Sequence, residues 1–161
     1  DRTRPSGDGD HMDTPTDIRE VLSALLSRQR LAVLSTHASG QPYASLVAFA
    51  GSEDLRSLYF VTPRATRKFS NLQSDGRVAL LVTSSANQEG DFHQAVAATV
   101  VGSARELAGP EKEAALQRYL QKHPYLEDFA RSPTSALVAV AARTYVLVKN
   151  FQNVMELHLD P

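Results

Sequence analysis

Apolar residues recur along the chain with two spacings, one typical of a helix and one typical of strands. Between residues 16 and 28 they lie three or four positions apart, which predicts an amphipathic helix whose buried face carries Ile18, Val21, Leu22, Leu25 and Leu26. Short apolar runs between turn residues then predict strands at residues 31–36, 43–50, 57–62, 78–84, 95–107, 135–141 and 144–150.

Two further helices are indicated by the residues at their ends. Thr66 is a good N-cap for a helix that runs to about residue 73. Gly109-Pro110 begins the other helix, and His123-Pro124 ends it at a place where a protonated histidine is favourable. A short helical turn is expected at residues 125–130.

The order of these elements predicts a mainly β (α+β) fold. Six or seven short strands and two or three helices, without βαβ alternation, fit a six- or seven-stranded antiparallel barrel with flanking helices better than a Rossmann sheet. Residues 135–141 and 144–150 are expected to form a hairpin around Ala142-Arg143. Residues 154–159 are expected to be a last edge strand or a C-terminal arm. His37 is expected to be solvated in a turn at residues 37–40.

The N-terminal segment differs in composition from the rest of the chain. Residues 1–15 contain almost nothing that can be buried, which predicts a disordered tail ahead of a single domain at residues 16–161. His11-Met12 resembles a cloning scar, so the residues before Met12 are expected to be vector-derived, with a native extension as the alternative.

Composition and charge exclude several classes of function. The 161 residues are 42% hydrophobic and 22% charged, as in an ordinary soluble globular protein. The net charge of −1 argues against nucleic-acid binding through bulk charge, and the absence of cysteine excludes disulfides, thiol nucleophiles and cysteine-based metal sites. No apolar run approaches the roughly 18 residues of a membrane span and no signal-peptide core is present, so a cytoplasmic location is expected.

The stretch LYFVTPRATRKFSNLQSDGRVALL, residues 58–81, carries the most chemical information. A strand ends at Thr62, and a helix follows with Arg67 and Lys68 in its first turn, where the helix dipole disfavours cations. A bound anion would compensate, because helix amides, an arginine fork and a lysine ammonium together suit a phosphate group. The alternative is a pair of solvated surface cations.

This stretch resembles the phosphate-binding signature of the pyridoxamine 5′-phosphate oxidase-like, FMN-binding split barrels. The residues in register with that signature are Thr62, Arg67, Lys68, Leu72, Arg77 and Val78. The resemblance extends over residues 31–159. It implies that Thr62, Arg67 and Lys68 hold the FMN phosphate, and that the cofactor lies between the two subunits of a homodimer. The cofactor-binding residues implied in this way are Ser45, Leu46, Val47, Ala48, Val61, Thr62, Arg67 and Lys68.

The chain also departs from the true oxidases of that family. Ser45, Ala50 and Ala97 stand where those enzymes carry arginine, lysine and glutamine, and their C-terminal Arg/His motif has no counterpart in residues 146–161. Vitamin B6 oxidation is therefore not expected. The C-terminal third is more similar to small FMN-binding and haem-utilisation proteins, and in the haem branch His158 would be the axial ligand. No other metal site is expected.

We expect an FMN-binding protein that acts as a small flavin-dependent oxidoreductase or reductase on an unknown substrate. The alternatives are a non-catalytic flavin carrier or sensor, a haem-binding or haem-utilisation protein, and a cofactor-free scaffold of the same fold. A deazaflavin would use the same phosphate cradle as FMN. No GxGxxG, P-loop, GxSxG or HExxH motif supports a different class.

Overall fold

The computed structural model describes residues 15–160, so the predicted tail lies outside the described residues except for Pro15. The helices are α1 (Pro15–Arg28), α2 (Arg67–Ser74), α3 (Asp91–Gln94), α4 (Gly109–Lys122), the 3-10 turn η1 (Pro124–Leu126) and α5 (Glu127–Arg131). The strands are β1 (Leu31–Ala38), β2 (Gln41–Gly51), β3 (Ser57–Pro63), β4 (Arg77–Thr83), β5 (Val96–Glu106), β6 (Ser135–Lys149) and β7 (Asn153–His158).

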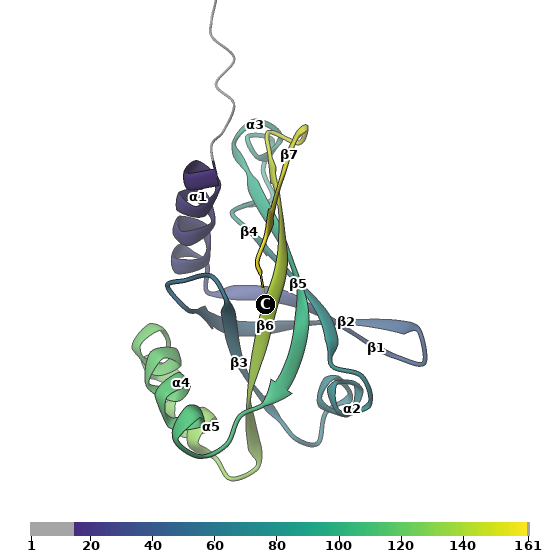
Figure 1. The fold of residues 1–161 in the computed structure, drawn as a ribbon, viewed down its shortest axis with the longest axis vertical. Helices are drawn as coiled ribbons and strands as arrows, with labels where there is room; N and C mark the ends of the chain where they lie inside the picture. The colour runs from purple at the N-terminus through teal and green to yellow at the C-terminus, as the bar shows by residue number, and fades with distance from the viewer. Residues whose placement is uncertain (1–14, 161) are drawn as a thin grey trace, which may run out of the picture.

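The strands form one antiparallel sheet in the order β3-β2-β1-β4-β5-β6-β7 (Figure 1). An additional pairing between β3 and β6 closes six of them into a barrel, and β7 extends the sheet beyond β6. The predicted antiparallel barrel with flanking helices is confirmed. No helix within residues 15–160 is both long and apolar enough to cross a membrane.

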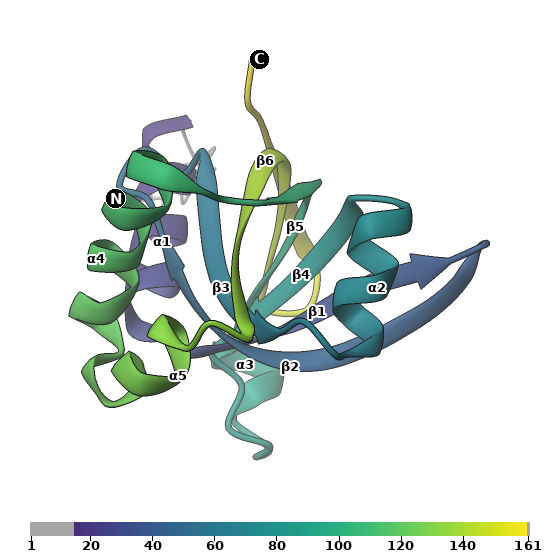
Figure 2. The ribbon, with the colours of Figure 1, turned by 90° about the horizontal axis from the view of Figure 1, so that it is seen from below.

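Two groups of apolar side chains hold the barrel and its helices together. The main core fills the barrel and includes the predicted inner face of α1, of which Leu22 is fully buried. A smaller core lies on the opposite face of β3 and β6, where α4 packs its Leu116 and Tyr119 against Val61 and Leu137. Figure 2 shows α1 and α4 on one side of the barrel and α2 on the other.

The predicted hairpin around Ala142-Arg143 is wrong, because β6 is one continuous strand of 15 residues. Opposite β5, the pairing shifts register: Val101 faces Thr144, whereas the next residue, Gly102, faces Ala142. Arg143 is thus the extra residue of a β-bulge, and the turn-like sequence marks a bend within the strand rather than its end. β6 pairs with β5 on both sides of the bulge, with β3 before it and with β7 after it.

Two histidines also differ from expectation. The turn of the first hairpin contains only Ser39 and Gly40, so His37 belongs to β1, is half-buried and contacts Asp75. His123 does end α4, but it is 93% buried from solvent and its Nε2 lies 2.7 Å from the carbonyl oxygen of Phe49. Burial lowers the pKa of His123, so the neutral ring, and not the protonated one, is favoured there.

The bulge predicts a strict size limit at Gly102. A methyl group at this position would overlap the carbonyl oxygen of Ala141, whereas one at Gly51 would come no closer than 3.6 Å to Leu26 Cδ1. We expect Gly102→Ala to lower the free energy of unfolding by about 1–3 kcal/mol, and the control Gly51→Ala to change it by less than about 0.5 kcal/mol. Urea unfolding measures both, and equal effects would contradict the bulge geometry.

The burial of His123 predicts a pH dependence of stability. The unfolded chain binds this proton with an ordinary pKa of 6.5, whereas the folded chain binds it more weakly. The free energy of unfolding therefore falls as pH drops from 6.5 through the folded pKa, and this contribution is constant above 6.5. Urea unfolding at pH 7.5 and 5.5 should show a smaller loss in His123→Gln than in the wild type, with no such difference in the exposed control His93→Gln. An unchanged loss in His123→Gln would contradict the assignment.

Candidate functional site

The site begins at an opening between β2 and β3. These strands pair only through Phe49–Gly51 of β2 and Leu58–Phe60 of β3. Beyond that, Val61 and Thr62 pair with β6 instead, while residues 41–48 of β2 pair with β1 alone. One edge of β2 is therefore left without a strand neighbour in the described sheet, and the predicted residues Ser45–Ala48 and Val61–Thr62 lie on either side of the opening.

The start of α2 is built by a network of threonine hydroxyls. Thr66 is the N-cap, as predicted: its backbone is extended, and its Oγ1 accepts the amide of Phe69 at 3.3 Å. The same hydroxyl donates to the carbonyl of Pro63 at 2.9 Å and lies 3.1 Å from Oγ1 of Thr62. Thr62 is fully buried, and its hydroxyl donates to the same carbonyl of Pro63 at 3.1 Å.

Arg67 and Lys68 occupy the first turn of α2, which contains no acidic residue. Nearby cations do have carboxylate partners, since Arg64 pairs with Glu106 and Arg77 with Asp75. Within residues 15–160, neither Arg67 nor Lys68 forms an ion pair. The helix dipole also disfavours positive charge at this end, so the local field is strongly positive and suits an anion.

A cavity of about 630 Å³ lies between α2 and the β1–β2 hairpin. The Arg67 guanidinium carbon lies 5.4 Å from the centre of the Tyr43 ring, a distance at which a cation–π attraction acts, and both residues line this cavity. The lining residues are Ala38, Gln41, Pro42, Tyr43, Arg67, Ser70 and Asn71. Arg67 thus faces a hollow large enough for part of a cofactor, while Lys68 lies outside its lining.

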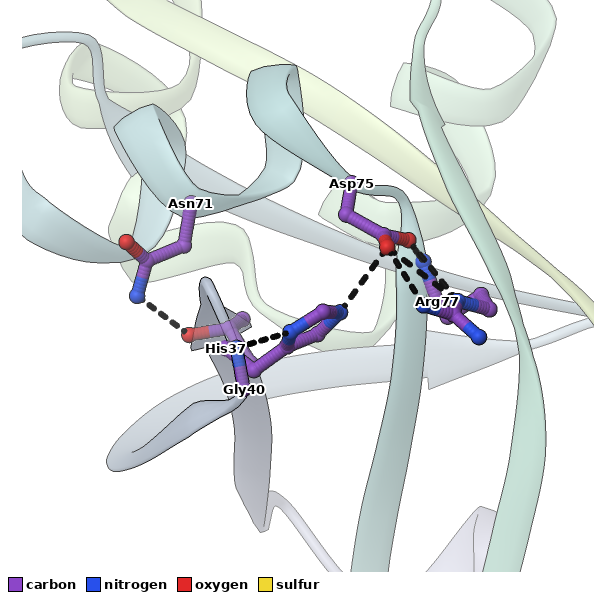
Figure 3. Close-up of polar contacts among 6 residues, drawn as sticks. His37, Gly40, Asn71, Asp75 and Arg77 are labelled. Carbon is purple, nitrogen blue, oxygen red and sulfur yellow. Dashed lines mark hydrogen bonds and ion pairs between the residues drawn. The ribbon is translucent and has the colours of Figure 1, made fainter.

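Polar contacts fix α2 to the hairpin (Figure 3). Buried Asn71 donates from Nδ2 to Oγ1 of Thr36 at 3.1 Å, and His37 Nε2 lies 3.1 Å from Oδ2 of Asp75. Arg77 binds both oxygens of Asp75 and, with a smaller effect from His37, holds the pKa of that carboxyl well below its usual range.

His37 has a positioning role in this arrangement. Its Nδ1 accepts the amide of Gly40 at 3.4 Å, so its Nε2 carries the proton that faces Asp75. Both ring nitrogens therefore have partners, and the ring links the end of α2 to the first hairpin. Sequence reasoning missed the contact because the Ser-Asp-Gly turn gives no sign of which strand it meets.

The predicted residues of β2 face different environments. Val47 is buried in the main core, Leu46 is 63% exposed on the outer face, and the Ala48 carbonyl accepts the Tyr119 hydroxyl at 3.3 Å. Ser45 is different: its hydroxyl is the one buried side-chain polar atom within residues 15–160 that lacks a hydrogen-bond partner. A buried hydroxyl of this kind indicates a missing partner.

Two other predicted residues are placed as follows. The Val61 side chain belongs to the small core under α4, so any contact with a ligand in the opening would come from its main chain. His158 is exposed on β7, where Nε2 lies 3.0 Å from Oε2 of Glu156 and Nδ1 lies 3.3 Å from Oγ1 of Thr144. Both of its ring nitrogens therefore have partners.

Comparison with known proteins agrees with this architecture. Residues 18–149 match the model of the pyridoxamine 5′-phosphate oxidase family, and the chain belongs to that family. Comparison with curated proteins gave no significant match.

Solved structures share the fold at low sequence identity. A haem-binding protein from Mycobacterium smegmatis matches with a TM-score of 0.77 and 16% identity over 98% of this chain, which spans 60% of that protein's length. General stress protein 26 from Bacillus anthracis matches with a TM-score of 0.63 and 20% identity, covering 88% of this chain and 98% of the other. A FAD-binding protein from Mesorhizobium loti matches with a TM-score of 0.61 and 20% identity, covering 78% of this chain and 89% of the other.

Proposed function

We propose that this protein binds FMN and anchors its phosphate at the N-terminus of α2. The observation that carries the proposal is the pair Arg67 and Lys68, which have no ion-pair partner within residues 15–160 and stand in a helical turn without an acid. Arg67 offers a planar fork, Lys68 a compact charge, and the first amides of α2 additional donors. Among relatives of the same fold, the Mesorhizobium loti protein is a FAD-binding protein, which supports a flavin.

The open edge of β2 suits the flavin ring. Main-chain amides and carbonyls on such an edge can pair with ring nitrogens and oxygens whatever the side chains are. The Ser45 hydroxyl, which lacks a partner, offers a further hydrogen bond beside this edge. The residues present therefore fit a flavin, although a deazaflavin with the same phosphate would fit the cradle equally well.

A flavin, when bound, supplies hydride and single-electron transfer, so the chain needs to supply only binding and orientation. We propose a small oxidoreductase or reductase, with a non-catalytic carrier or sensor as the alternative. In the described cluster of His37, Asp75 and Arg77, each side chain has a partner, and the cluster positions the hairpin. Reduction of bound FMN by NADH or NADPH, followed by turnover on an acceptor, would distinguish the enzyme from the carrier.

We also propose that the protein is a homodimer with the cofactor at the subunit interface. Val33 of β1 pairs with Leu46 of β2 and with Leu81 of β4 on the outer face of the sheet. These three apolar side chains are 38%, 63% and 41% exposed, and Leu31 on the same face is 52% exposed. A contiguous apolar surface of this kind favours a protein partner.

Sedimentation at micromolar concentration should give twice the mass of the chain, and a monomer would contradict this proposal.

Haem binding is the second candidate, favoured by the similarity to the Mycobacterium smegmatis haem-binding protein. His158 would have to give up its contact with Glu156 or Thr144 to ligate iron. A Soret band on haem titration that is lost in His158→Ala would support this candidate over the flavin.

The phosphate cradle gives a direct mutational prediction. Arg67→Ala and Lys68→Ala should each weaken FMN binding by about 1.5–3 kcal/mol, because each removes charge-assisted hydrogen bonds to the phosphate. Flavin fluorescence titration measures the affinity, and urea unfolding should show that neither variant is less stable, since both cations oppose the helix dipole.

Arg19→Ala is the matched control, because Arg19 is an exposed cation on α1, on the other side of the barrel from α2. It should leave FMN affinity unchanged. The phosphate assignment fails if the Arg67 and Lys68 variants bind FMN as tightly as the wild type does.

A further inference from the structure

A second cavity, of about 640 Å³, lies between α1, the end of β2 with its following turn, and α4. It shares no lining residue with the cavity at Arg67, and Figures 1 and 2 place α1 and α4 on the side of the barrel away from α2. Its polar lining comes from Ser23, Ser27, Ser52, Glu53, Arg118, Gln121 and Lys122. The remaining lining is apolar, so the cavity is amphipathic.

The two cations of this cavity are held in place by main-chain carbonyls. Arg118 donates from Nε to the carbonyl of Gly51 at 2.5 Å. Lys122 donates from Nζ to the carbonyl of Leu26, in the last turn of α1, at 2.7 Å, and its ammonium lies 4.0 Å from the centre of the Phe49 ring. Each contact uses part of the donor group. Both terminal NH₂ groups of Arg118 and two N–H bonds of Lys122 have no hydrogen-bond partner within residues 15–160.

Within residues 15–160, no carboxylate compensates these charges. Neither Arg118 nor Lys122 forms an ion pair in the described part of the chain, and Glu53, the acidic lining residue, is exposed and contacts neither of them. Burial and, to a lesser extent, the nearby Arg30 lower the pKa of Lys122 to about 8. A partly buried ammonium without a counter-charge is unfavourable, and an anion in the cavity would remove that cost.

We propose that this cavity is a binding site for a small organic anion, which presents a carboxylate or phosphate group to Arg118 and Lys122. The two residues are one helical turn apart on α4, and both line this cavity. Ser23 and Gln121 supply neutral hydrogen-bonding groups beside them, and Leu26 and Leu55 supply apolar contact for the rest of the ligand. The site is independent of the flavin assignment, since it uses none of the same residues.

The proposal is tested by nuclear magnetic resonance on the ¹⁵N-labelled full chain, titrated separately with inorganic phosphate and with citrate. At least one of the two anions should shift the amide signals of Gly51 and residues 118–122 saturably. Comparing the two affinities shows whether the cavity prefers a phosphate or a carboxylate group. This readout separates the cavity from α2, where phosphate would shift the amides of residues 67–69. The affinity at Arg118 and Lys122 should also fall between pH 7 and pH 9, as Lys122 loses its proton.

Gln121→Glu is the decisive variant, because it places a negative charge in the cavity and leaves both carbonyl contacts intact. It should weaken anion binding about tenfold or more. The control Gln117→Glu adds the same charge to the same helix outside the cavity lining, and should change the affinity less than twofold. The proposal is overturned if neither anion shifts residues 118–122, or if Gln121→Glu and Gln117→Glu bind equally well.

Discussion

The pairing of β6 is the constraint on which the rest of the structure depends. Over its 15 residues this strand pairs with β3, β5 and β7, and it closes the barrel by taking β3 as a neighbour. Thr62 is thereby held against Ala136 of β6, away from β2. The opening at the edge of β2 follows directly, and so does the position of α2 next to it. The bulge at Arg143 lies between the part of β6 that pairs with β3 and the part that pairs with β7.

At that opening the protein accepts an arrangement that local energetics disfavour. Two cations begin α2 where its dipole is positive, and the Ser45 hydroxyl is buried without a partner. The helix is nevertheless held by apolar burial of Phe69 and Leu72 and by the contact between Asn71 and Thr36. Departures from local preference that the surrounding structure supports are typical of functional sites. The same reasoning applies to Lys122 on the other side of the barrel, which is partly buried and has no carboxylate partner in the described part of the chain.

Sequence reasoning succeeded where the determining interactions are local. The Thr66 cap, the cations after it and the inner face of α1 depend on spacings within one helix, and the family signature follows the same short stretch. It failed where a distant partner decides the outcome. The carbonyl that holds His123 belongs to Phe49, 74 residues earlier, and the bulge that keeps β6 continuous is set by its pairing with β5. The contact of His37 with Asp75 also depends on the assembled barrel. The same is true of the Ser45 hydroxyl, which lacks a hydrogen-bond partner within residues 15–160.

The central claim is that the N-terminus of α2 recognises a flavin by its phosphate. Comparing the affinities of FMN and riboflavin for the wild-type protein tests it most directly, because the two differ only in that group. Two charge-assisted contacts predict that FMN binds about 10²–10⁴ times more tightly than riboflavin. Equal affinities would contradict the claim, as would failure of the protein to retain added FMN.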